Sequence, residues 1–244
     1  ILVSLGGDSL GKGGDTDASP RRDVDAIAQA LASLAAENEM VLAHGIGPRL
    51  DIALRNALPD RDLLTVIAEV IVSADDPALA GRSEEGERGA RLQPPAPEPS
   101  AIAALRGLRI LIEAGVIVVC GGAGLVPITL DSTGAMHGVD APVDNDLTAA
   151  LLARRLDADL LVVLTEARPG WLDQGSAEGR GLRAISPAQL RKMGVPAGPL
   201  SSKVEAACRF VDATGRRAVI GAITDAAEIV RGVAGIQVSA QPPV

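Results

Sequence analysis

The chain alternates short apolar runs with amphipathic stretches, and this alternation most limits the folds it can adopt. Apolar runs with the length of buried strands cover residues 1–5, 40–43, 63–72, 116–120 and 160–164. Between the first two runs, apolar residues from Val24 to Leu34 recur at steps of three and four, the spacing of one helix face. Strand and helix alternation predicts an α/β fold, a three-layer α/β/α sandwich with a mostly parallel central sheet.

We expect the whole chain, residues 1–244, to form one domain. Residues 74–100 are rich in proline and charge, which predicts a linker or a reduced insertion. Asp144 is expected to cap a helix that runs to Leu156, because its side chain can accept from first-turn N–H groups. Further helices are expected to begin at about Pro20 and at about Ser100, and a short one is expected to end at Ala57. Three more are expected at 187–192, 203–213 and 225–230. A hairpin is expected at 128–140, and strands are expected at 218–220 and 236–238.

Composition excludes several classes of function. Trp171 and Phe210 are the only aromatic residues and the net charge is -8, so a base-stacking or phosphate-binding nucleic-acid surface is not expected. No apolar run reaches 18 residues, and the first residues lead into a glycine-rich turn, so we expect a cytoplasmic protein without a membrane span. Cys120 and Cys208 are expected to be buried, reduced thiols.

Glycine-rich turns follow several of the expected strands. Residues 6–13 nearly match the phosphate-loop spacing, but Gly13 lacks the hydroxyl that this motif requires, and the next helix starts late. A Gly-Gly turn whose N–H groups face phosphate is our interpretation, and a plain tight turn is the alternative. His44 and His137 are too few and too far apart for a metal cluster, so His44 is expected to be structural.

Six blocks in order resemble carbamate kinases of the amino-acid kinase superfamily. The first two are the glycine turn at 3–8 and the turn at 43–49, and the third is the glycine-rich strand exit at 114–127. The fourth is the helix start at 144–153, the fifth is a nucleotide loop at 164–173, and the sixth is the lysine-bearing helix at 202–210. The resemblance implies the amino-acid kinase fold, a homodimer, and ATP-dependent phosphoryl transfer with ADP and Mg²⁺ to or from a carbamate or carboxylate oxygen.

The resemblance also implies roles for individual residues. Backbone N–H groups of Gly6 and Gly7 would hold the transferred phosphate, Asp146 would orient the other phosphate-binding groups, and Lys203 would neutralise developing charge. Such positioned charge and N–H donors are what a loose phosphoryl-transfer transition state requires. The nucleotide would lie near Thr165, Glu166, Trp171 and Lys203. The small-molecule acceptor would lie near Gly45, Ile46, Gly47, Gly121, Gly122 and Ala123.

The chain departs from the family pattern at the chemistry itself. Asn145 replaces a lysine, Asp8 and Ile46 each replace an asparagine, and Leu125 replaces a glycine. Only three of the 23 Lys and Arg residues are lysines, so we consider each lysine individually as a candidate functional residue. Two interpretations follow: a kinase with an altered acceptor pocket, or a catalytically impaired relative that binds nucleotide and acts in regulation or assembly.

Overall fold

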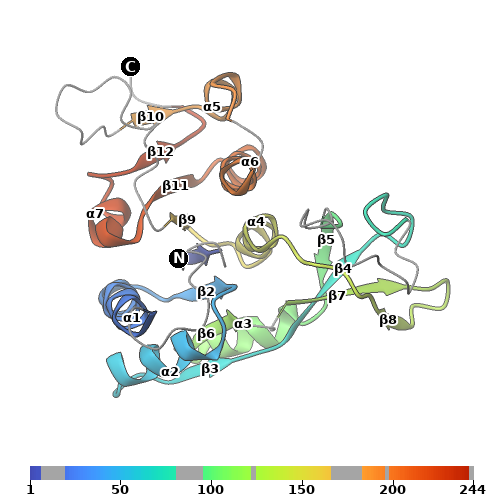
Figure 1. Cartoon of the computed structure of the whole chain (residues 1–244), viewed down its shortest axis with the longest axis horizontal. Coiled ribbons are helices and arrows are strands. Elements are labelled where there is room, and N and C mark those ends of the chain that lie inside the picture. The colour runs from blue at the N-terminus through green and yellow to red at the C-terminus, as the bar shows by residue number, and fades with distance from the viewer. Residues whose placement is uncertain (7–19, 81–95, 122–124, 166–182, 196–197, 242–244) are drawn as a thin grey trace.

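The computed structural model describes residues 1–6, 20–80, 96–121, 125–165, 183–195 and 198–241 (Figure 1). The helices are α1 (Pro20–Glu37), α2 (Pro48–Ala57), α3 (Leu105–Glu113), α4 (Asn145–Arg155), α5 (Pro187–Lys192), α6 (Pro199–Thr214) and α7 (Ala226–Val230), with the 3-10 turn η2 (Ile223–Asp225). The strands are β1 (Leu2–Leu5), β2 (Val41–His44), β3 (Leu63–Thr65), β4 (Ala68–Val72), β5 (Pro99–Ile102), β6 (Ile117–Gly121), β7 (Leu125–Leu130), β8 (Met136–Gly138), β9 (Leu160–Thr165), β10 (Arg183–Ile185), β11 (Arg217–Ala222) and β12 (Ile236–Val238).

A large sheet forms the middle layer of the molecule. Its eight described strands follow the order β10-β12-β11-β9-β1-β2-β6-β3, and all neighbours pair in parallel except β11 with β12. All residues of β1 are buried, as expected for a strand that is covered on both faces. This architecture confirms the predicted α/β sandwich with a mostly parallel sheet.

Alternating side chains of the large sheet pack into two separate hydrophobic cores, one on each face. Leu2, Ala43 and Cys120 pack on the face covered by α4 and α6. Val3 and Leu42, one position away on their strands, pack on the opposite face with α1, α2 and α7. The period of two along each strand therefore assigns each residue to one helix layer. Both cysteines are free and buried, as predicted.

A second, four-stranded sheet lies beside the large one, with the order β5-β4-β7-β8. Figure 1 shows β7 and β8 projecting away from the C-terminal elements α5, α6 and α7, which gather at the other end. The antiparallel β7–β8 pair confirms the predicted hairpin, and its turn is held by Asp131, which accepts from the Thr133 and Ala135 N–H groups. No described helix is long and apolar enough to cross a bilayer.

Two predicted elements were wrong, and a third begins at a different residue from the one expected. Residues 63–72 form two strands, since β3 pairs with β6 in the large sheet and β4 pairs with β5 and β7 in the small one. A continuous apolar run carries no periodic signal of such a change of sheet. The segment at Ser100 is the strand β5, not a helix, because it pairs antiparallel with β4, and α3 begins only at Leu105. The helix expected at 203–213 begins earlier, at Pro199, which suits the first helical turn.

Candidate active site

The candidate site lies where the central parallel strands end. Strands β9, β1, β2 and β6 are neighbours and run parallel, with Leu5 opposite both His44 and Leu164, and His44 opposite Gly121. Their carboxyl ends therefore share one edge of the sheet, which is where ligands bind in open α/β sheets. This edge brings together the predicted residues Gly6, Gly45, Gly121 and Thr165, although they are far apart in the sequence.

Helix α4 presents its N-terminus to this edge. The Asp144 side chain caps the helix by accepting from the Leu147 N–H at 2.9 Å, as predicted. Asn145 is the first helical residue and is half-buried, and Asp146 follows it with only 6% of its surface exposed. A helix N-terminus with free N–H groups stabilises negative charge, so this end of α4 suits a phosphate.

Asp146 and Lys203 form a buried ion pair between α4 and α6. The Lys203 Nζ donates to Asp146 Oδ2 at 2.9 Å, and Lys203 is only 5% exposed. The Ser4 hydroxyl of β1 donates to the other carboxylate oxygen, Oδ1, at 2.7 Å. Ser4 lies on the same face of β1 as Leu2, which faces α4, so the strand period brings its hydroxyl to the carboxylate. Three elements thus fix one ammonium group.

Burial raises the pKa of the Asp146 carboxyl, while the Lys203 charge and the hydrogen bonds from Ser4 and Lys203 act in the opposite direction. Taking two charges out of water costs several kcal/mol per ion, which only good geometry and further hydrogen bonds offset. Such a pair is weak support for stability, and a need for a positioned cation explains its presence better.

Gly6 directly follows β1 and leaves space for the lysine ammonium. A Cβ atom at Gly6 would lie 2.9 Å from Lys203 Nζ and 3.7 Å from Asp146 Oδ2. Any side chain here would therefore push against the ion pair. The bare backbone at Gly6 therefore leaves room for the ammonium at the end of β1.

The turn after β2 holds the predicted acceptor residues. Gly45 donates its N–H to the Leu5 carbonyl at 3.1 Å, which ties the turn to the end of β1. Gly47 precedes α2 with a φ of 94°, a left-handed conformation that favours glycine. Ile46 is half-buried between them. The turn is therefore fixed next to Gly6 by its backbone.

His44, Asp51 and Thr65 form a polar cluster under this turn, in which His44 and Asp51 are buried and Thr65 is exposed. His44 Nε2 lies 2.7 Å from Asp51 Oδ1, and the Thr65 hydroxyl donates to Asp51 Oδ2 at 3.0 Å. The N–H of Ile46 donates to His44 Nδ1 at 3.2 Å. The sequence predicts a structural role for His44, and these contacts are consistent with it, whereas the pattern carries no signal for Asp51 or Thr65.

The remaining predicted residues divide into two groups. Thr165 ends β9, is buried, and donates to the Gly221 carbonyl at 3.5 Å. Gly7, Asp8, Gly122, Ala123, Glu166 and Trp171 lie outside the described residues. Sequence reasoning missed Ser4, although a polar residue inside an otherwise apolar strand was a usable signal.

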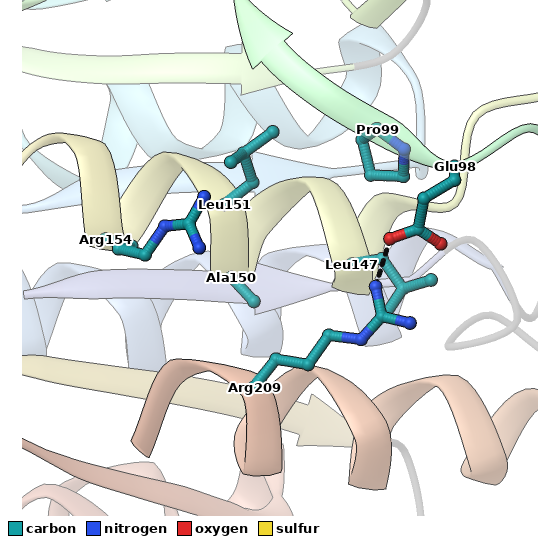
Figure 2. Close-up of a pocket in the computed structure, with 7 residues that line it drawn as sticks. All are labelled: Glu98, Pro99, Leu147, Ala150, Leu151, Arg154 and Arg209. Atoms are coloured by element: carbon teal, nitrogen blue, oxygen red, sulfur yellow. Dashed lines mark hydrogen bonds and ion pairs between the residues drawn. The ribbon is translucent and has the colours of Figure 1, made fainter. Parts of the chain in front are cut away.

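A separate small hollow lies between α4, α6 and the start of β5 (Figure 2). Its volume is about 100 Å³, and it is lined by Glu98, Pro99, Leu147, Ala150, Leu151, Arg154 and Arg209. Figure 2 shows Arg209 of α6 reaching to Glu98, with which it forms an ion pair. Ligand pockets usually enclose about 300 to 1,000 Å³, so this hollow is too small for a nucleotide.

The described residues contain no group of three or more His, Cys, Asp or Glu side chains that could hold a metal ion. Mg²⁺ in phosphoryl transfer commonly binds through one or two carboxylates together with substrate phosphates.

A fixed ammonium beside unsubstituted backbone, at the carboxyl edge of a parallel sheet, supplies the positioned positive charge that favours transfer of a phosphoryl group. The fold and site thus define a phosphotransferase. The chain belongs to the amino acid kinase family, whose model matches residues 1–222.

Individual relatives cover almost the whole chain. A carbamate kinase of Haemophilus influenzae is 30% identical over 298 residues, covering 98% of this chain and 96% of that protein. A carbamate kinase of Rhizobium meliloti is 32% identical over 302 residues, covering 98% and 93%. Both alignments are longer than the 244 residues of this chain, so the relatives carry insertions that the chain lacks.

The fold has the same relationship. The structure of carbamate kinase from Giardia lamblia bound to AMP-PNP superposes with a TM-score of 0.83, at 22% identity and 98% coverage of both chains. At this identity the likeness concerns the fold. It confirms the amino-acid kinase architecture that the sequence blocks predicted.

Proposed function

We propose that the protein is a carbamate kinase-like enzyme that moves a phosphoryl group between ATP or ADP and a carbamate-like or carboxylate-like oxygen. The observation that carries this proposal is the Lys203–Asp146 pair, whose ammonium lies 2.9 Å from the position that a Cβ at Gly6 would take. The named relatives are carbamate kinases at 30% and 32% identity over nearly their full length, which supports the acceptor class.

The proposed step is a direct transfer. An oxygen of the acceptor forms the new bond to the γ-phosphorus, while the bond from phosphorus to the bridging oxygen breaks and its electron pair leaves with ADP. Lys203 neutralises charge on the phosphoryl oxygens as they separate from both partners. Asp146 holds the ammonium in place, and Ser4 holds Asp146, so little reorganisation is needed during transfer.

The backbone supplies the remaining donors in this proposal. The Gly6 N–H group and the α4 N-terminus at Asn145 face the phosphate. The resemblance assigns Gly7 and Asp8 to the same phosphate-binding role. The nucleotide lies along the end of β9, near Thr165, Glu166 and Trp171, and brings Mg²⁺ with its phosphates. The acceptor is held against the turns at 45–47 and 121–123.

Two substitutions reduce the positive charge and change the shape of this site. Asn145 stands where the family has a lysine, and Ile46 stands where it has an asparagine. Removing one positioned cation or donor from such a site costs about 10² to 10³ in rate. We therefore propose a slower enzyme, or one with a different acceptor from that of its relatives.

Two measurements test the function. Titration calorimetry with MgATP should show saturable binding, and a protein that binds no nucleotide would not be a kinase. ADP release should then be followed across carbamate, small carboxylates and phosphonates. Release with one of these acceptors identifies the substrate class, whereas nucleotide binding without release on any acceptor would indicate the impaired, regulatory relative.

We further propose a homodimer built on the edge strand β3 and helix α3. Leu64 and Ile67, at and just after β3, are 43% and 65% exposed, and Ile110 on α3 is 56% exposed. In the described residues β3 is the last strand of the large sheet, and an open apolar edge favours association. Sedimentation equilibrium should give twice the monomer mass, and a monomer at micromolar concentration would contradict this assignment.

We also propose a single catalytic domain in the cytoplasm, with residues 74–100 as a reduced insertion. Free, buried cysteines are usual in a reducing compartment. The longer relatives in the alignments support the reduction. Limited proteolysis should cut first between 74 and 100 and leave two fragments that stay associated, because strands from both sides of this segment are neighbours in the large sheet.

A further inference from the structure

His44 connects the acceptor turn to the rest of the fold. It is the last residue of β2, only 1% of it is exposed, and both ring nitrogens are engaged. Its neighbour on the strand, Ala43, faces α4 and α6, so His44 faces the opposite layer, where α2 lies. Asp51 of α2 meets it there.

The partners of the ring determine its tautomer. The Ile46 N–H is a donor, so Nδ1 must accept with its lone pair. The proton of a neutral ring is then on Nε2, from where it is donated to Asp51 Oδ1 at 2.7 Å. Thr65 donates to the other oxygen of Asp51, which fixes that carboxylate. The hydrogen bonds therefore run in one direction: the Ile46 N–H donates to His44, and His44 and Thr65 both donate to Asp51.

We propose that His44 is a positioning residue, whose neutral Nε2–H tautomer sets the conformation of the acceptor turn by accepting the Ile46 N–H. The proposal rests on the assignment of the turn at 45–47 to the acceptor. With the Gly45 N–H bound to Leu5 and the Ile46 N–H bound to His44, the turn enters α2 in one geometry. Ile46 is thereby held at a fixed place beside the bound acceptor.

Protonation would disrupt this arrangement. A charged imidazole would place a proton on Nδ1, facing the Ile46 N–H, and two donors repel each other. Asp51 is the only described charged group that acts on His44, and burial outweighs it, so the pKa of His44 is lowered. The site therefore favours the neutral ring that the turn requires.

Substitutions can separate the two ends of the ring. His44→Asn keeps an acceptor near the Nδ1 position, whereas His44→Gln keeps a donor near Nε2 and loses the bond from Ile46. We expect His44→Gln to raise the KM for carbamoyl phosphate at least fivefold, the scale of one lost hydrogen bond, with the KM for MgADP within twofold of wild type. His44→Asn should lie closer to wild type. Equal KM changes for both substrates, or no change in His44→Gln, would overturn the proposal.

An NMR measurement needs no activity and so separates this proposal from the proposed function. The chain has two histidines, and His137 is exposed on β8, so it provides an internal reference. Nitrogen-15 correlation spectra should show His44 as the neutral Nε2–H tautomer at pH 7. The Ile46 amide should exchange faster in His44→Gln than in wild type. A Nδ1–H tautomer, or an unchanged Ile46 exchange rate, would refute the positioning role whether or not the wild type turns over carbamoyl phosphate.

Discussion

A single methyl group at Gly6 should disable the site while leaving the fold intact. In Gly6→Ala the new Cβ would lie 2.9 Å from Lys203 Nζ, whereas an ordinary contact needs about 3.5 Å. The φ of Gly6 is outside the left-handed region, so alanine brings no backbone strain. The ammonium, at the end of a flexible side chain, must move by about 0.6 Å, which exceeds the tolerance of about 0.5 Å for a productive site.

The expected loss is kinetic. A displacement of 1 Å can cost about 10²-fold, so Gly6→Ala should lower kcat for ATP formation by about 10- to 100-fold. The free energy of unfolding should change by less than about 1 kcal/mol, since no buried group loses its partner entirely. Initial rates and urea unfolding curves measure the two quantities on the same preparations.

Gly107→Ala is the matched control. Gly107 lies inside α3, and its added Cβ would meet no atom within 4 Å. This variant should keep full activity and gain about 0.5 to 1 kcal/mol, because alanine favours a helix interior. Activity of Gly6→Ala within threefold of wild type would refute the placement of Lys203 at the transferred group. An effect that persists undiminished in a Lys203→Ala background would refute the proposed cause.

Three further predictions concern other parts of the chain. The Thr148 hydroxyl is buried and has no hydrogen-bond partner among the described residues, so Thr148→Val should raise the free energy of unfolding in urea by about 1 kcal/mol. Thr214→Val is the control, because it loses the 2.7 Å hydrogen bond to the Phe210 carbonyl and should lower the free energy of unfolding. Burial lowers the pKa of His44 in the folded state, so below pH 6.5 the unfolded state binds more protons, and the stability advantage of wild type over His44→Gln should shrink as the pH falls. An advantage that stays constant from pH 7 to 5 would contradict this linkage. Asn145→Lys should raise the rate of ATP formation from carbamoyl phosphate. An unchanged rate would show that the missing lysine is not the main cause of lower activity and would point to the acceptor turn instead.

The periodic parts of the fold followed from the sequence. The Val24 to Leu34 spacing predicted α1, and Asp144 predicted the start of α4, because local hydrogen bonds and one apolar face decide both. The split of residues 63–72 between two sheets did not follow, since partner strands decide where an apolar run pairs. Long-range pairing is not encoded in a local pattern.

The site was predictable in part for the same reason. The resemblance identified Asp146 and Lys203, and the structure brings them together at 2.9 Å. Asp51 was missed because a charged residue in a helix usually faces water, and only the tertiary contact with His44 shows that it is buried. Ser4 could have been found from its position in an apolar strand.

The central claim is that Lys203 acts on a transferred phosphoryl group, and the rate of ATP formation from MgADP and carbamoyl phosphate tests it most directly. Wild type should form ATP, Lys203→Ala should lose about 10² to 10³ in rate, and the exposed Lys192→Ala should match wild type. Thermal melting should show that all three proteins are folded, since Asp146, whose pKa is already raised, can take up a proton when the lysine is absent. A folded Lys203→Ala that forms ATP at the wild-type rate would contradict the claim.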